Sequence, residues 1–171
     1  MAMRKLVLSV AALALLAAAC GASAEEQAAV ELASAIEADF DLRLEQVNDT
    51  NDWCEVVTVL EDVNVGLELV DPNNQVAVEA AYSSAVEVLV AAGELAPGPI
   101  EPDMMITVVA FERLTAALED ADWNFNRADF FANALDPDDV AIASFNISRY
   151  NFDECNVGTD PGDPPDVGND Q

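Results

Sequence analysis

Histidine is absent from this 171-residue chain, and its one lysine, Lys5, lies near the start. Without histidine or a further lysine, the rest of the chain cannot form a Ser-His-Asp, Cys-His or Ser-Lys site. Zinc, copper and haem sites usually need imidazole or thiolate ligands, and the sequence has no GxGxxG-type phosphate loop. We therefore expect a protein that is not an enzyme and has no resident cofactor.

Positive charge is also scarce, because six Lys and Arg residues face 33 Asp and Glu residues, for a net charge of −27. Nucleic acid binding requires Lys and Arg to neutralise phosphate, so we expect no nucleic acid partner. Hydrated carboxylates in a salty medium explain such acidity, and a cationic or basic partner is the alternative.

The first 19 residues have the pattern of an export signal. Arg4 and Lys5 precede an apolar run, 6–19, that is shorter than the roughly 20 residues of a membrane span. The segment Ala17-Ala18-Ala19-Cys20 resembles the lipobox of bacterial lipoproteins, in which the cysteine receives diacylglycerol and becomes the new N-terminus. The resemblance implies lipidation at Cys20, with residues 20–25 as a short tether and the membrane as a partner. Two acyl chains would give stable attachment.

A second cleavage site competes with the lipobox. Ala22-Ser23-Ala24 is an A-x-A signature, and cleavage after Ala24 would release a soluble secreted protein. The three cysteines favour the lipobox, since lipid on Cys20 leaves Cys54 and Cys155 as a pair for a disulfide in an oxidising compartment. Two free thiols are the alternative.

Apolar residues recur three or four positions apart through most of the chain between residues 26 and 155, the spacing of one helical face. The first predicted helix is 26–47. The second, 53–67, begins at a predicted capping box of Asp52 and Glu55. Four valines and Gly66 disfavour a helix there, so a strand pair is the alternative.

Three prolines, each preceded by an acidic residue, indicate helix starts, because aspartate caps free amides and proline at the first position loses no hydrogen bond. Asp71-Pro72 predicts a helix to Ala92, ended by Gly93. Glu101-Pro102-Asp103 and Asp136-Pro137 predict two more, separated by a short helix over 127–135. Their inward faces are predicted to be Met104, Val108, Phe111, Leu114 and Leu118, and then Val140, Ala143, Ile147 and Tyr150.

The predicted fold is therefore all-α, a compact bundle of five or six helices in one domain, 26–155. The Pro, Gly and Asp composition of 156–171 predicts a disordered acidic tail. Cys155 is expected just beyond the last helix. This late cysteine, in the segment 148–155, is similar to that of small helical lipoproteins of high-GC Gram-positive bacteria, whose members mostly lack an assigned activity.

One segment offers weak candidate ligands for calcium, namely Asp120, Asp122, Asn124 and Asn126, whose oxygens lie at alternate positions. Arg127 and Asn133 stand where the helix-loop-helix calcium motif has glycine and glutamate, so capping and solvation are the default interpretation. A carboxylate pair acting on a glycoside is a second alternative, although no spacing singles out a pair.

Seven of the eleven aromatic residues lie between residues 123 and 152, together with Arg127 and Arg149. Large rings usually form the core under neighbouring helices, and this is the favoured interpretation. Exposure of Trp123 or Phe125 would instead indicate an interaction surface. The seven are Trp123, Phe125, Phe130, Phe131, Phe145, Tyr150 and Phe152.

Together these features predict an exported, lipid-anchored, acidic helical protein of the cell envelope with a structural or binding role. Its partners would be the membrane, through Cys20, and a cationic ligand or envelope protein. The alternatives are a carboxylate-dependent cell-wall hydrolase and a divalent-cation-binding protein.

Overall fold

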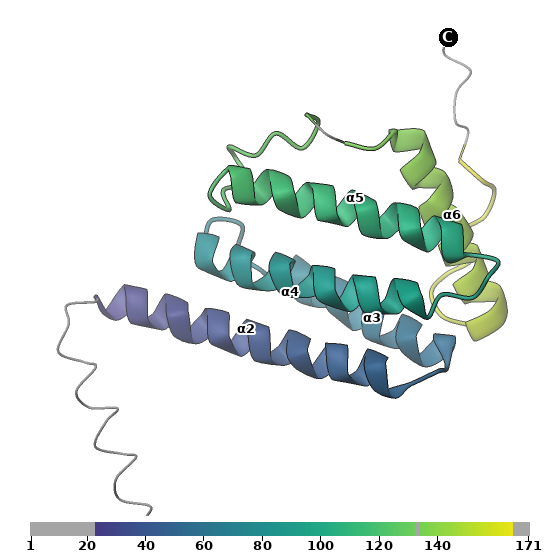
Figure 1. Ribbon diagram of the computed structural model, residues 1–171, viewed down its shortest axis with the longest axis horizontal. Helices are drawn as coiled ribbons and strands as arrows, with labels where there is room; N and C mark the ends of the chain where they lie inside the picture. The colour runs from purple at the N-terminus through teal and green to yellow at the C-terminus, as the bar shows by residue number, and fades with distance from the viewer. Residues whose placement is uncertain (1–22, 133, 166–171) are drawn as a thin grey trace, which may run out of the picture.

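The computed structural model describes residues 23–132 and 134–165, which form five α-helices and no β-strand (Figure 1). The all-α fold class predicted from the sequence is confirmed. The predicted signal, 1–19, and Cys20 lie outside the described residues. The helices are α2 (Ala24–Asp49), α3 (Trp53–Glu68), α4 (Gln75–Glu94), α5 (Glu101–Asp120) and α6 (Pro137–Cys155).

Figure 1 shows α2, α4 and α5 side by side in one layer, with α3 behind α2 and α4 and with α6 at the right-hand end. Helix α4 is central because it contacts α2, α3 and α5, while α6 contacts α5 and α3. Over the described residues, no Cα atom of α3 lies within 8 Å of a Cα atom of α5. The helices α3, α4, α5 and α6 therefore form a closed ring of neighbours, and α2 packs outside it against α3 and α4.

Alanine and valine supply most of the buried core. Small side chains on α4 let the neighbouring helices approach closely, and they bury fully there. By length and composition, α4 is also apolar enough to cross a membrane, but its contacts with three helices account for that composition. Its buried residues are Ala77, Val78, Ala80, Ala81, Ala85, Val88, Ala92 and Gly93.

Helix α2 begins two residues before the predicted start, at a capping box that the sequence interpretation missed. The Ser23 N–H donates to Glu26 Oε2 at 2.6 Å, and the Glu26 N–H donates to Ser23 Oγ at 3.2 Å. Each side chain satisfies a backbone amide that the helix itself leaves free. Residues 23–25, predicted to belong to a flexible tether, therefore form the cap and first turn of α2.

Helix α3 is a helix over its whole predicted range, so the alternative of a strand pair was wrong. Asp52 caps it as predicted, with Oδ1 accepting from the Cys54 N–H at 2.9 Å. Glu55 does not close a direct capping box. Its Oε2 accepts from the Thr50 hydroxyl at 2.5 Å, and the Thr50 hydroxyl oxygen in turn accepts from the Asp52 N–H at 3.0 Å.

Both predicted ends of α4 were wrong. Asp71 caps no helix, because its Oδ1 accepts from the Asn73 N–H at 2.9 Å in a tight turn. Asn74 is the cap instead and accepts from the Ala77 N–H at 3.2 Å. Gly93 lies inside the helix, where an added Cβ would meet Val108 Cγ2 at 3.3 Å. Close packing of α4 on α5, rather than a helix stop, accounts for this glycine.

Helix α5 begins at the predicted residue, with Glu101 as its first residue rather than its cap. The N-cap is Ile100, which has no capping side chain. The Asp103 carboxylate accepts from Asn146 Nδ2, at 3.1 and 3.2 Å from its two oxygens. This contact joins the first turn of α5 to the middle of α6.

The helix predicted over 127–135 was wrong, because the described part of the α5–α6 connection (residues 121–136) consists of turns. Asp122 and Trp123 have φ angles of 53° and 60°, in the left-handed region, which ends α5. Asn124 Oδ1 accepts from a backbone N–H two residues later, and Asp129 Oδ1 does the same. Such local bonds compete with helix formation.

Helix α6 begins at the predicted Asp136-Pro137, where Asp136 Oδ1 accepts from the Asp138 N–H at 3.0 Å. It ends at Cys155, which is therefore part of the helix rather than beyond it. The chain then turns back, with the Val157 N–H donating to the Asn151 carbonyl at 3.2 Å. Residues 156–165, predicted to be disordered, thus begin with defined contacts to α6.

Candidate binding groove

The ring of α3, α4, α5 and α6 surrounds an open groove with a volume of about 900 Å³. Twenty residues line it, and they come from all four helices and from residues 157–161. A hollow of this volume lies within the range of small-molecule binding sites. We call it the α3–α5–α6 groove, after the helices that supply most of its walls.

Helix α3 contributes one of its two apolar faces to the groove. Val56, Val59 and Val63 form the other face and are buried against the rest of the core. The residues of the groove face also recur three or four positions apart, but they begin one residue later, at Val57. The groove face consists of Val57, Leu60, Glu61, Asn64 and Val65.

Helix α5 supplies the opposite wall. Its groove residues are Met104, Thr107, Ala110, Phe111 and Leu114, and Leu89 of α4 lies between the two walls. Met104 is 2% exposed and Val57 on α3 is 3% exposed, so both side chains lie at the bottom of the groove. Three of the apolar residues predicted as the inward face of α5 therefore line an open space.

Helix α6 brings polar groups to the groove. Ser144, Ser148 and Asn151 lie four and three positions apart, which places them on one helical stripe. Val140 and Ile147 are the apolar members of this wall. Hydroxyl and amide groups beside apolar side chains are the usual means by which a binding site orients a ligand.

Charge is almost absent from the lining. Glu61 is its one charged residue, and no arginine belongs to it. Asn64, one turn further along α3, donates from Nδ2 to Glu68 Oε1 at 3.0 Å. In a chain with a net charge of −27, the lining of the groove thus carries a single charged group, the exposed carboxylate of Glu61.

The segment after α6 completes one side of the groove. Val157, Gly158, Thr159 and Pro161 belong to the lining. An ion pair holds the segment, since Arg149 Nη1 lies 2.7 Å from Asp160 Oδ1, and the same arginine lies 3.6 Å from Asp153 through Nε.

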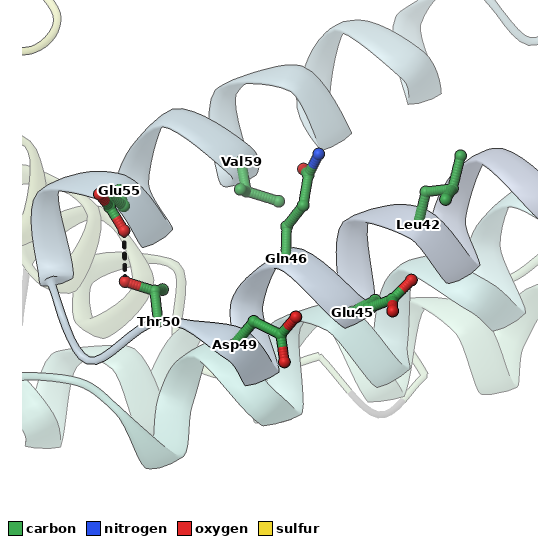
Figure 2. A pocket seen from close by; sticks show the side chains of 7 residues that line it. All are labelled: Leu42, Glu45, Gln46, Asp49, Thr50, Glu55 and Val59. Atoms are coloured by element: carbon green, nitrogen blue, oxygen red, sulfur yellow. Dashed lines mark hydrogen bonds between the residues drawn. The ribbon is translucent and has the colours of Figure 1, made fainter.

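A smaller pocket of about 500 Å³ lies between the end of α2 and the start of α3 (Figure 2). Three carboxylates line it, those of Glu45, Asp49 and Glu55. Figure 2 shows Glu55 directed to Thr50 across the turn between the helices, whereas Gln46 and Val59 lie between the two helices. The other lining residue is Leu42.

The four weak calcium candidates are not assembled into an obvious site. Asp122 Oδ2 lies 3.2 Å from Arg127 Nη1, and Asn124 Oδ1 accepts from the Asn126 N–H at 3.0 Å. Asp120 lies at the exposed end of α5. In residues 23–132 and 134–165, no group of three or more Cys, Asp or Glu side chains is placed to hold a metal ion.

The aromatic residues divide between a packed cluster and the surface. Phe125 meets Tyr82 edge-on with ring centroids 5.6 Å apart, and Tyr82 stacks on Phe111 at 5.7 Å. Burial raises the pKa of the Tyr82 hydroxyl above its usual value. Phe131 is 89% exposed, while Trp123 is half-buried like Phe125. The favoured interpretation of all seven rings as core is therefore wrong for Phe131, and the other six are only partly buried.

The predicted disulfide is present. Cys54 and Cys155 are bonded, with their Cα atoms 5.2 Å apart, and join the first turn of α3 to the last residue of α6. Lipidation of Cys20 stays a prediction.

Sequence reasoning missed the polar half of the groove. Ser144, Ser148, Asn151 and Thr107 lie on helix faces that also carry predicted core residues. These polar residues share helix faces with Ile147 and Phe111, and this pattern could have indicated the groove. A polar residue on an inward face needs a hydrogen-bond partner or a solvated space. No family model, curated protein or solved structure matches this chain.

Proposed function

We propose that this protein is an exported, lipid-anchored, acidic helical bundle that serves as a binding component of the cell envelope. The observation that carries the binding role is the α3–α5–α6 groove, an open and largely uncharged hollow on an otherwise acidic molecule. The proposal assigns no catalytic residue and no cofactor.

Two structural features support the lipobox over the A-x-A site as the point of cleavage. Cleavage before Cys20 would retain Ser23 and its reciprocal bonds with Glu26, whereas cleavage after Ala24 would remove this cap from α2. The Cys54–Cys155 bond also leaves Cys20 as the cysteine available for lipid.

The depth and composition of the groove support a binding role. The groove is open, so its apolar lining faces water in the absence of a ligand. A ligand with an apolar body would remove that apolar surface from water, which is favourable. The ring of helix contacts and the disulfide hold the walls in place before any ligand enters, which limits the cost of binding.

The anchor is tested by the intact mass of the full chain after expression in a lipoprotein-processing bacterium. We expect a chain that begins at diacylglycerol-modified Cys20 and takes up thiol label only after reduction. The matched control is Cys20→Ser, which should lose the lipid mass and keep the disulfide. A wild-type chain that begins at Glu25, or has an unmodified Cys20, would overturn the anchored localisation.

The binding role is tested on the same processed protein with an uncharged photoreactive alkyl probe. We expect the label on peptides of α3, α5 and α6. Ser144→Phe should block labelling by filling the groove, while Ala141→Phe, an exposed position on α6 outside the lining, should not. Absence of label from these peptides, or equal labelling of the two variants, would overturn the binding role.

A further inference from the structure

The walls of the groove extend along the helices, and their length indicates the shape of a ligand that would fill it. Lining residues extend from Val57 to Val65 on α3 and from Met104 to Leu114 on α5. At 1.5 Å per residue, these faces are about 12 and 15 Å long. A chain-like ligand lying along the helices would contact both walls, whereas a compact one would leave part of each exposed.

The bottom of the groove is apolar. Val57 and Met104 are nearly buried there, and the half-buried ring of Phe111 lies on the same wall as Met104. Contact with these side chains gains free energy only for a group that gives up little hydration. The part of the ligand that enters the groove is therefore a hydrocarbon or another apolar chain.

The charge of the lining indicates the charge of the ligand's head group, the end opposite its apolar chain. Glu61 is exposed and is the one charged group of the lining, so an ammonium beside it would gain a Coulomb attraction. An anionic head would meet that carboxylate and the field of a chain with a net charge of −27. We propose that the groove binds an elongated cationic amphiphile, with its apolar chain between α3 and α5 and its positive head beside Glu61.

This inference rests on the proposed binding role and is tested by changing the head group alone. Three photoreactive probes share one dodecyl chain and carry a trimethylammonium, an uncharged diol or a sulfonate head. Each is used below its micelle-forming concentration, at fixed ionic strength, on the protein processed by its bacterial host. Peptide masses then give the amount of label on α3, α5 and α6 for each probe.

We expect the ammonium probe to label the groove peptides most strongly and the sulfonate probe least. Glu61→Gln should lower ammonium labelling about two- to fivefold, the range of an exposed ion pair, and leave diol labelling unchanged. Glu87→Gln is the matched control, because it removes one carboxylate from an exposed position on α4 outside the lining. It should leave the labelling by all three probes unchanged.

Two results would overturn the inference. Equal labelling by the ammonium and diol probes would show an apolar site without charge preference, and the binding role would stand without this ligand class. Equal losses from Glu61→Gln and Glu87→Gln would show attraction to the acidic molecule as a whole. Absence of diol label from the groove is a different failure, because it removes the binding role itself.

Discussion

The indole Nε1–H of Trp53 donates to Oδ1 of Asn151 at 3.0 Å, and so joins the first residue of α3 to the next-to-last turn of α6. The Cys54–Cys155 bond joins the same two helix ends. Asn151 also lines the α3–α5–α6 groove. The groove wall at Asn151 is therefore fixed by one partly buried hydrogen bond, with a covalent bond between the same two helices close by in sequence.

We expect removal of the disulfide to be the most destabilising change among those considered. The bond joins residues 101 positions apart, and closing a loop of this length stabilises a fold by about 4 to 5 kcal/mol in the chain-entropy model. Urea unfolding of Cys54→Ser/Cys155→Ser should show most of this loss. Reduced wild type is the control and should match the double variant. A loss below about 1 kcal/mol would contradict the prediction.

The ion pair between Arg149 and Asp160 should hold the segment over 157–161 without adding much to global stability. Exposed ion pairs contribute at most about 1 kcal/mol, so Asp160→Asn should leave the urea midpoint almost unchanged. Hydrogen exchange at the Val157 amide should nevertheless become faster. Asp163→Asn, two residues past the lining, is the control. Equal exchange in the two variants would show that the ion pair does not hold the segment.

Ser23→Ala should loosen the first turn of α2 by removing the side-chain half of the capping box. The expected cost is about 1 kcal/mol, measured as faster hydrogen exchange at the Glu26 amide. Ser34→Ala is the control, because Ser34 is exposed in the middle of the same helix, where alanine is favourable. Unchanged exchange at Glu26 would mean that the cap does not order this end.

Asp71 should make stability depend on pH in the acid range. Hydrogen bonds from the Asn73 backbone and side chain lower the Asp71 pKa below its usual 3.8. A lowered carboxyl pKa contributes stability above the unfolded pKa, and this contribution is lost as pH falls through the folded pKa. The difference in Tm between wild type and Asp71→Asn should therefore be constant above about pH 5 and shrink at lower pH. Asp163→Asn corrects for the lost charge, and a difference that grows on acidification would contradict the assignment.

Much of the helical framework could be predicted because its signals are local. Asp136 caps α6 through an amide two residues away, and Asp52 does the same for α3. A predicted helix cap was wrong where the polar side chain forms a hydrogen bond with a different residue. Asp71 bonds to Asn73 in a turn, so this aspartate does not cap a helix at Pro72, where the sequence predicted one.

The groove could not be predicted from the sequence because it depends on the separation between two helices, α3 and α5. The apolar faces of α3 and α5 have ordinary helical spacing, and each alone indicates core. They line an open space because α6 meets α3 through Cys155 and Asn151 at one end, while the Cα atoms of α3 and α5 stay more than 8 Å apart. The spacing of apolar residues indicates which face of a helix points inward. It does not indicate which other helix packs against that face.

The connection between α5 and α6 lies between Cys54 and Cys155 in the sequence, so a protease cut in this connection would fall inside the loop that the disulfide closes. Phe131, at 89% exposure in that connection, is an accessible site for an enzyme that cuts after aromatic residues. A single cut there would separate α2–α5 from α6, yet Cys54 and Cys155 would still join the two polypeptides. The molecule would persist as a two-chain protein and come apart only on reduction.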